Sequence, residues 1–305
     1  MDEPLSISAD ASPGKDRRAG LKRFLFYAAL SLVAMTMILP FTWMVLTSFK
    51  TQPEVVSQDW IPAAWRTGKG PGGGAAPRVL ENYDQVFREI KFGRYYFNSV
   101  LVAGWVTFLQ VLTSSMAAYA FARIPWRGRD KVFLLYLATM MIPGVVLIIP
   151  NYQTMFTLNQ VWSGWLDGYK ALIIPASFSA FGTFLLRQFM LTIPLSLDEA
   201  AEIDGASRFR IFWDVILPLA RPGVITLSIF TFMGNYGSFF WPLITIRSDE
   251  MLTLPIGMLY FDSYYQRATH LLMAASVMNV APLIVLFVLL QKYLVKGIQL
   301  GAVKG

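Results

Sequence analysis

Six apolar runs, each about as long as a membrane-spanning helix, constrain what this chain can fold into. A helix needs about 20 mostly apolar residues to cross the hydrocarbon core of a bilayer. We therefore predict an all-α integral membrane protein with six transmembrane helices. The runs cover about residues 24–46, 97–122, 132–150, 170–191, 223–246 and 271–293.

The composition agrees with lipid as the solvent of these runs. Only 15% of the 305 residues are charged and the mean hydropathy is +0.48, whereas a soluble domain carries roughly 25% charged residues. There is no cysteine, and His270 is the only histidine. Disulfides, a cysteine-ligated metal and a multi-histidine metal site are therefore not expected.

The distribution of basic residues predicts the orientation. Six spans place both ends of the chain on one side, which then holds 16 of the 26 Lys and Arg residues. Most of the others lie in one long loop, about 47–94, and long loops count little in the positive-inside rule. We predict a cytoplasmic tail at 1–23, a transmembrane domain at 24–294 and a cytoplasmic tail at 295–305. The basic loops also explain the net charge of +7, so no nucleic acid partner is expected.

Two further segments bear on the organisation of the chain. The apolar run after the polar first 23 residues is too long for a signal peptide, which predicts an uncleaved first span. The Gly- and Pro-rich stretch 69–77 in the long loop predicts a flexible loop tip without a function of its own.

The interiors of the runs carry few charges. Five of them have no Asp, Glu, Lys or Arg in their middle, and Arg187 lies near one end of the fourth, where its side chain could reach the membrane surface. Ion-coupled carriers usually need a buried charged relay, which disfavours that class. Prolines are expected to bend several runs: Pro143, Pro150, Pro175, Pro242 and Pro282.

The segment 194–222, PLSLDEAAEIDGASRFRIFWDVILPLARP, is the polar exception between the fourth and fifth runs. It holds eight charged residues. Ser196 and Glu199 match an S-x-x-E capping box, which predicts a short helix from about residue 197. Gly205 suits a left-handed cap at the end of that helix.

The second half of the segment predicts another short helix, at about 208–216. Ser207 can cap its beginning, Pro218 would break its end, and Pro222 would open the fifth span. The segment is therefore expected to form two short helices at a sharp angle on the cytoplasmic surface.

The residues alone leave two interpretations of this segment. A hairpin lying on lipid headgroups would suit Arg208 and Arg210 and the aromatic residues near them. Docking into a groove of another protein would suit Ala200 and Ala201, whose small side chains let a second surface approach closely. An anionic membrane would also repel the acids of the first helix, which favours docking.

The same segment resembles the EAA loop of the membrane subunits of ABC importers. The resemblance rests on Glu199-Ala200-Ala201, three residues, Gly205, nine residues, Val215, one residue and Leu217-Pro218. Other stretches resemble the carbohydrate-importer branch, and most closely the second permease subunit of maltose- and glycerol-phosphate-type systems. These are AAYAFARIPWRGRD (117–130), IPGVVLIIP (142–150), EIDGAS (202–207), GIQLGAVKG (297–305), SFKTQPEVV (48–56) and ENYDQVF (81–87).

The resemblance implies a type I importer permease fold (MetI-like) in a bacterial inner membrane. It also implies three kinds of partner: a second, different permease subunit, two ATP-binding cassette ATPase subunits and an extracytoplasmic solute-binding protein. The chain would form half of the translocation pathway for a sugar or oligosaccharide. It would hold no cofactor and would not be an enzyme, since the ATPases would bind and hydrolyse ATP. The chain has no G-x-x-x-x-G-K-[ST] phosphate loop of its own.

The resemblance assigns the ATPase-coupling role to Glu199, Ala200, Ala201, Asp204 and Gly205. Glu199 would make a polar contact with the ATPase, the two alanines would form a closely packed face, and Gly205 would permit the turn.

The fifth run departs from the family, which often has a Trp-Asn pair before a Phe and a Trp-Pro-Leu. The aligned stretch here is YGSFFWPLI (236–244). We place a possible substrate path at Asn235, Tyr236, Phe240 and Trp241, whose rings could stack on sugar faces or simply pack.

Two alternative functions remain. One is an ABC permease for glycerol phosphate or another non-sugar solute. The other is an ion-coupled secondary carrier.

Overall fold

The computed structural model describes residues 14–57, 59–62, 65, 80–263 and 268–302, so the stretch 69–77 lies outside it. Within these residues the secondary structure is helical and contains no strand, which confirms the predicted all-α fold. Three of the helices are long and apolar enough to cross a membrane, and the number rises to six if each of three bent helix pairs is one span.

The three long helices are each more than 30 residues in length. They are α1 (Gly14–Thr47), α5 (Phe92–Arg123) and α17 (Thr269–Ala302). The predicted tails at 1–23 and 295–305 therefore overlap helices, because α1 begins at Gly14 and α17 continues to Ala302.

The first two bent pairs cover the third and fourth apolar runs, and the third pair joins part of the polar segment 194–222 to the fifth run. Their two parts meet at 90°, 43° and 78° respectively. The first pair joins α6 (Arg129–Ala138) and η1 (Thr139–Met141) to η2 (Gly144–Leu147) and α7 (Ile148–Val161). The second joins α8 (Tyr169–Ile173) and η3 (Pro175–Ser177) to α9 (Ala180–Leu191), and the third joins α11 (Arg208–Arg210), η4 (Ile211–Ile216) and α12 (Leu217–Leu219) to α13 (Arg221–Tyr236).

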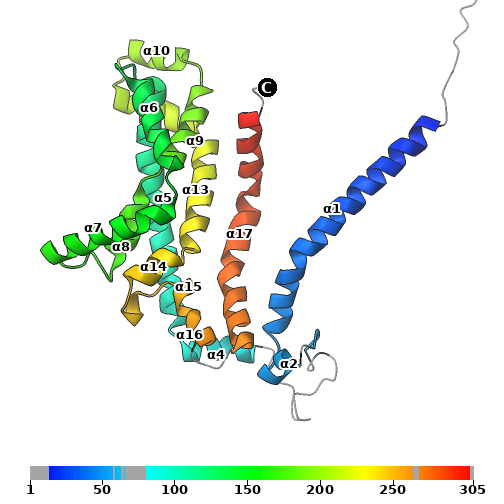
Figure 1. Cartoon of the computed structure of the whole chain (residues 1–305). Helices are drawn as coiled ribbons and strands as arrows, with labels where there is room; N and C mark the ends of the chain where they lie inside the picture. The colour runs from blue at the N-terminus through cyan, green and yellow to red at the C-terminus, as the bar shows by residue number, and fades with distance from the viewer. Residues whose placement is uncertain (1–13, 58, 63–64, 66–79, 264–267, 303–305) are drawn as a thin grey trace, which may run out of the picture.

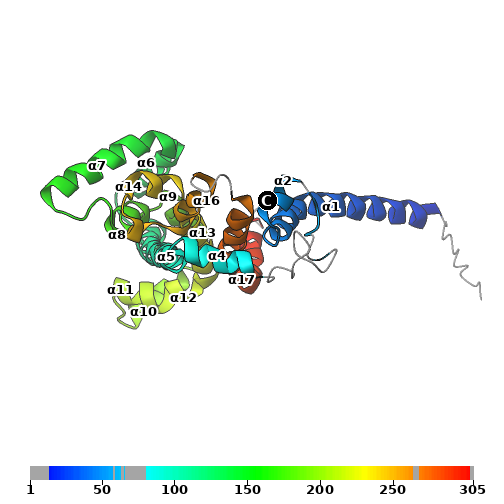
Figure 2. The same ribbon diagram turned by 90° about the horizontal axis from the view of Figure 1, so that it is seen from below.

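Helix α5 is the centre of the bundle and packs against α9 and α13 (Figure 1). Glycines allow these helices to approach closely, as in other membrane bundles. A Cβ atom at Gly182 of α9 would lie 2.6 Å from the Ser114 Oγ, and one at Gly223 of α13 would lie 2.5 Å from the Phe189 ring. Seen from below, the α6–α7 arm and the helices α10 to α12 lie on opposite sides of α5 (Figure 2).

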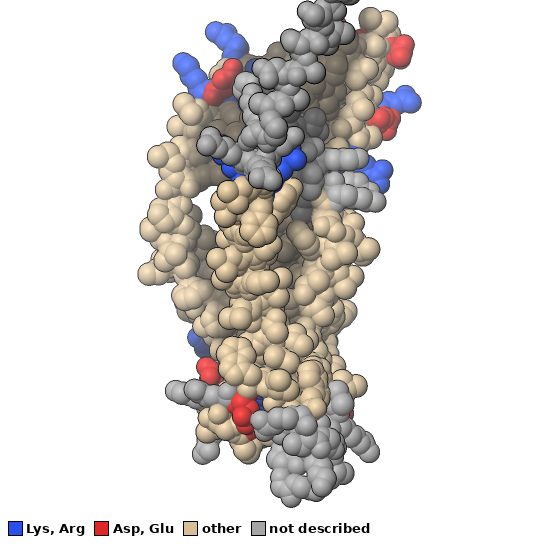
Figure 3. All heavy atoms as spheres, turned by 90° about the vertical axis from the view of Figure 1, so that its right-hand side faces the viewer, with Lys and Arg blue, Asp and Glu red and all other residues tan. Residues whose placement is uncertain are grey.

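Helix α1 leans away from the bundle, and the C-terminal end of α1 contacts α17 (Figure 1). None of its apolar window is buried within the chain, so its surface is available to lipid or to another subunit. On the face of the molecule nearest α1, charged side chains gather towards the two ends and an uncharged band lies between them (Figure 3).

Three predicted runs differ from single straight spans, and the fourth bends by 43° between η3 and α9. The third bends by 90° beside Pro143, which separates η1 from η2. The fifth ends as a helix at Tyr236, well before residue 246, and α14 (Phe240–Thr245) follows as a separate helix. The Arg187 side chain in α9 is 15% exposed. Its guanidinium lies 4.2 Å from the centre of the Phe133 ring, and its Nη2 lies 3.7 Å from Oδ1 of Asp130, a side chain that is itself 74% exposed.

The end of the bundle opposite α10 is built from short helices (Figure 1). These are α2 (Gln52–Val56), α4 (Glu81–Glu89), η5 (Asp249–Met251), α15 (Leu254–Gly257) and α16 (Leu259–Ser263). We call residues 247–252, with the side chains that hold them, the far-end network.

Polar bonds hold the far-end network from two sides. The Lys91 Nζ lies 2.8 Å from Asp249 Oδ2 and also pairs with Glu250. The Asn98 Nδ2 donates to the Glu250 and Leu252 carbonyl oxygens at 2.9 and 2.8 Å. From the other side, Asp167 Oδ1 accepts from the backbone N–H groups of Arg247 and Ser248, each at 2.9 Å.

Candidate functional site

We call the segment 194–222 the elbow. Its first helix is α10 (Ser196–Ile203), which lacks the predicted capping box. Ser196 is the first helical residue, the cap position is Leu195, and no side chain caps the helix. Instead the Leu195 carbonyl accepts from the N–H groups of Asp198 and Glu199 at 2.9 and 3.2 Å. The backbone closes the first turn, which leaves the side chains of Asp198 and Glu199 for other contacts.

The end of α10 follows the prediction. Gly205 has a φ of +78°, a conformation that favours glycine. Its N–H donates to the Glu202 carbonyl at 3.0 Å, and the Ala206 N–H donates to the Ala201 carbonyl at 2.9 Å. This pair of bonds is a Schellman motif, so Gly205 turns the chain sharply towards the second half of the elbow.

The second half of the elbow is longer than predicted. Ser207 caps it, with its Oγ accepting from the Arg210 N–H at 3.3 Å, as expected. The helical path passes Pro218 and ends one residue later, at Leu219, so the break lies slightly beyond the predicted end at about 216. The helical path from Arg208 continues to Leu219 through the π-helical turn η4 and then bends by 78° into α13, which has Pro222 in its first turn.

The inner face of this second half is buried against the bundle. Ile211, Phe212 and Ile216 are at most 2% exposed. They share an apolar core with α5 and α9, and the Phe212 ring centre lies 5.3 Å from that of Tyr119 in α5. Packing of this kind fixes the second half to the membrane helices.

A buried ion pair ties α10 to the same helices. Arg123, in the last turn of α5, places its Nη1 3.0 Å from Asp198 Oδ2, and the two side chains are only 2% and 7% exposed. Its Nη2 donates to the carbonyls of Met190 and Ile193, each at 2.6 Å. One guanidinium therefore connects the end of α5, the end of α9 and the first turn of α10.

The outer face of α10 is open. Of the predicted coupling residues, Glu199, Ala200, Asp204 and Gly205 are exposed, whereas Ala201 is half-buried and packs against the inner core. Leu197, Ala200 and Ile203 recur every third position, and Ile203 is 87% exposed. Residues at this spacing share one face of a helix, so α10 presents an apolar stripe of small and aliphatic side chains.

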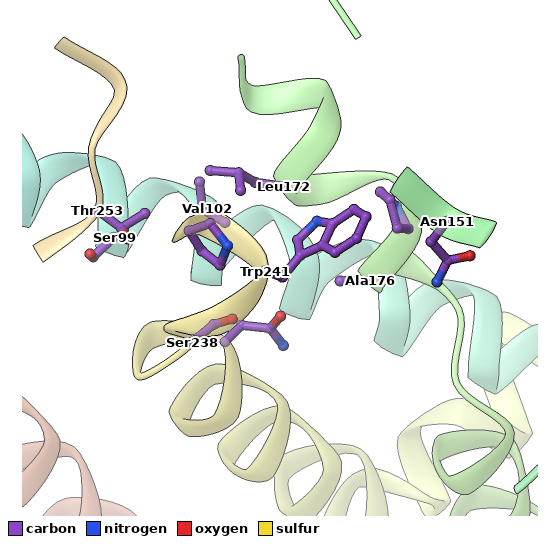
Figure 4. A pocket seen from close by; sticks show the side chains of 11 residues that line it. Ser99, Val102, Asn151, Leu172, Ala176, Ser238, Trp241 and Thr253 are labelled. Atoms are coloured by element: carbon purple, nitrogen blue, oxygen red, sulfur yellow. The ribbon is translucent and has the colours of Figure 1, made fainter. Parts of the chain in front are cut away.

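A cavity of about 200 Å³ lies near the other end of α13 (Figure 4). Polar and apolar side chains line it from α5, α7, α13 and the segment around α14. Those shown together in Figure 4 include Ser99, Asn151, Ser238, Trp241 and Thr253. The hydroxyl of Thr253 is buried and has no hydrogen-bond partner among the described residues.

The four predicted substrate-path residues do not lie together. Asn235 and Trp241 line the cavity. The Trp241 indole is oriented by a bond of 2.8 Å from its Nε1 to the Ala171 carbonyl. Tyr236 is 1% exposed and stacks on Phe232, while Phe240 is 54% exposed on the outer surface. The structure thus brings two of the four to one cavity.

Comparison with known proteins places the chain in a family. Residues 110–300 match the family of binding-protein-dependent transport system inner membrane components. The arabinooligosaccharides transport system permease protein AraQ of Halalkalibacterium halodurans is 31% identical over 95% of this chain and 100% of its own length. The chain belongs to this family of inner membrane components. The trehalose/maltose transport system permease protein MalG of Thermococcus litoralis is also 31% identical, over 95% of this chain and 99% of its own.

The fold of this permease subunit also matches a solved structure. A chain from a bacterial ABC transporter involved in the import of the acidic polysaccharide alginate superposes with a TM-score of 0.76 at 20% identity, covering 92% of this chain and 99% of that one. This likeness confirms the predicted MetI-like permease fold.

Sequence reasoning missed one residue that positions the elbow. Arg123 was counted among the loop arginines that set orientation, yet it is among the most buried charged side chains that the structure describes. The available signal was its place in AAYAFARIPWRGRD, directly after an apolar run.

Proposed function

We propose that this permease subunit imports a sugar or oligosaccharide, as half of the translocation pathway of an ABC importer. The related permeases are named for arabinooligosaccharides and for trehalose and maltose, and they match nearly the whole chain. In this proposal the protein lies in the bacterial inner membrane and both of its termini are cytoplasmic, as the basic residues around the elbow indicate.

The elbow is the observation that carries the coupling part of this proposal. Its first helix, α10, is a short surface helix with an open apolar stripe, and Arg123 fixes the base of α10 to α5 and α9. Such a helix suits a groove of a partner protein. In this proposal α10 enters a cleft of an ATPase subunit, Glu199 and Asp204 make polar contacts at its rim, and closure of the ATPases moves the elbow.

The remaining partners follow from the family. A binding-protein-dependent system requires a solute-binding protein outside the membrane, and one permease chain supplies half of a pathway. The partner permease is a different chain, so the pair is a heterodimer. Two ATPase subunits bind at the elbow side, and they bind and hydrolyse the ATP.

The cavity at Asn235 and Trp241 is the proposed substrate-facing part of this chain. It lies at the end of α13 away from the elbow and combines an indole with amide and hydroxyl groups, which is the chemistry that recognises sugars. Its volume of about 200 Å³ is below that of a typical ligand pocket. It therefore accommodates part of a saccharide, with the rest contacted by the partner permease.

The proposal is tested by transport in proteoliposomes. The chain is reconstituted with its partner permease, ATPases and binding protein, and ATP-driven uptake of labelled malto- and arabino-oligosaccharides is compared with uptake of glycerol phosphate. We expect saccharide uptake that stops when the phosphate-loop lysine of the ATPases is replaced. A preference for glycerol phosphate would replace the saccharide assignment, and uptake without ATPases that an uncoupler abolishes would replace the ABC mechanism.

A further inference from the structure

We infer that the Arg123–Asp198 pair is the link through which movement of α10 reaches α5 and α9, so that Arg123 is a positioning residue for coupling. The inference rests on the proposed function, since it concerns how the elbow transmits movement. It assigns that transmission to a particular contact and not to the elbow as a whole.

The position of the pair is the first argument. Asp198 lies in the first turn of α10, at the base of the helix whose outer face is open. The rest of α10 packs against η4, the second half of the same elbow. The ion pair instead joins α10 directly to the end of α5, the helix around which the bundle is built.

The geometry at Arg123 is the second argument. Its guanidinium contacts the carboxylate of Asp198 and the carbonyls of Met190 and Ile193 at 2.6 to 3.0 Å. Those carbonyls are at the end of α9, where helix acceptors lack partners within the helix. A displacement of Asp198 therefore acts on α5 and α9 through the same group.

Burial is the third argument. Both side chains are more than 90% buried, so neither water nor salt weakens their attraction as it does at the surface. The Asp198 oxygens accept no hydrogen bond of good geometry among the described residues. The attraction between the two charges is therefore the main bond that holds Asp198 to Arg123, so removal of either charge removes this contact.

Arginine is required by this geometry. The guanidinium presents donors in a planar fork and reaches three acceptors at once, whereas the lysine ammonium is a compact charge on a flexible stem. Arg123→Lys keeps the charge but cannot hold the same three oxygens. Asp198→Asn keeps the shape but removes the charge.

The test measures solute transported per ATP hydrolysed by the full complex. We expect R123K, which keeps the positive charge, to assemble with the partner subunits in wild-type yield and to hydrolyse ATP within about twofold of wild type. D198N leaves Arg123 as a lone buried charge and should assemble in lower yield, so its uptake is compared per ATP hydrolysed by the complex that does assemble. Their uptake per ATP should fall at least tenfold. The double variant R123Q/D198N removes both charges, so no lone buried charge opposes folding, and it should be uncoupled in the same way. The matched control is D214N, the same replacement in the exposed Arg210–Asp214 pair of the elbow, which should transport normally.

A second readout is independent of the solute. The chain has no cysteine, so spin labels at S196C on α10 and M116C on α5 report the distance between the two helices. ATP with vanadate should leave that distance distribution unchanged in the parent and change it in the D198N background.

Two results would overturn the link: wild-type uptake per ATP in R123K and D198N, or uptake that falls only in proportion to lost assembled complex. Failure of the proposed function would look different. In that case the parent complex would import no saccharide, while the spin-label distances would still show whether α10 and α5 move together.

Discussion

The two ends of the bundle hold α5 by charged groups in opposite ways. At the elbow the contact is one ion pair with side chains 2% and 7% exposed. At the far end the Lys91–Asp249 pair is about half exposed on both sides, and it is one bond among several to residues 247–252. Exposed pairs are each worth little, whereas a buried pair is costly to break.

This difference teaches how each end can respond to force. The far-end network is redundant, so loss of one bond leaves others that hold the same backbone. The elbow contact has no comparable substitute at Asp198, since Arg123 is the only cation within 4 Å of its carboxylate among the described residues. Several parallel bonds suit the far end as a fixed surface, whereas a single buried ion pair at the elbow suits the transmission of movement from α10 to α5.

The largest expected effect comes from Arg123→Ala. It leaves Asp198 as a lone buried charge and removes the donor from the Met190 and Ile193 carbonyls. We expect a loss of about 3–5 kcal/mol in the free energy of unfolding, measured by denaturant titration of the detergent-solubilised complex. The far-end counterpart, Lys91→Ala, should shift the same curve by no more than its error. Equal shifts would remove the contrast between the two ends.

The second effect concerns Gly257 in α15, at the far end. A Cβ there would lie 2.2 Å from Cδ2 of Tyr95, a ring that α5 holds in place. We expect Gly257→Ala to cost about 1–3 kcal/mol by overpacking. The matched control is Gly234→Ala in α13, where a Cβ would meet nothing within 4 Å and alanine favours the helix. A neutral result at Gly257 would show that the far end yields more easily than its packing indicates.

How far the sequence predicts this molecule depends on whether a feature is local. The positive φ of Gly205 and the cap at Ser207 depend on nearby residues, and the structure confirms both. The box at Ser196 was also a local prediction, and it was wrong because the Leu195 carbonyl closes the turn first. The S-x-x-E pattern alone does not show whether Ser196 is the cap residue or the first residue of the helix, and here the cap position is Leu195.

Features that depend on distant residues were not predictable in this way. Arg123 is separated from Met190 by 67 positions in the sequence, so no local pattern shows that its charge is buried. The 90° bend of the third run is a different case, because Pro143 predicted a bend there and only its angle could not be read from the sequence. Asn235 and Trp241 were proposed together with Tyr236 and Phe240. Asn235 and Tyr236 are adjacent in α13, where successive side chains point in different directions, and the fold brings only Asn235 and Trp241 to the cavity.

A smaller effect is expected at Gly205, which closes the elbow. Its φ of +78° disfavours any residue with a Cβ, yet a Cβ would meet nothing within 4 Å. Gly205→Ala should therefore cost about 1–2 kcal/mol from the backbone alone, and Gly205→Val should cost more because it is β-branched. The measurement is the unfolding free energy of both variants. If valine proved no worse than alanine, the turn would not be held in the left-handed conformation.

The smallest effect is a pH dependence confined to the far-end network. The hydrogen bond from Lys91 lowers the pKa of Asp249. Burial alone would raise the pKa of Asp167, but the hydrogen bonds from Ser248 and the Arg247 backbone lower it overall. A lowered pKa stabilises the folded form above the ordinary Asp value of about 3.9, and that stabilisation is lost as pH falls through the folded pKa.

We expect amide exchange at 247–252, corrected for its intrinsic rate, to be constant from about pH 7 to 5 and to accelerate below about pH 4. In a D167N/D249N variant the exchange should already be faster at neutral pH and should depend less on acid, because the two carboxylates with a lowered pKa are gone. Protection that is unchanged in acid would mean that the far end is held by packing, in which case the contrast with the elbow would lie in geometry and not in charge.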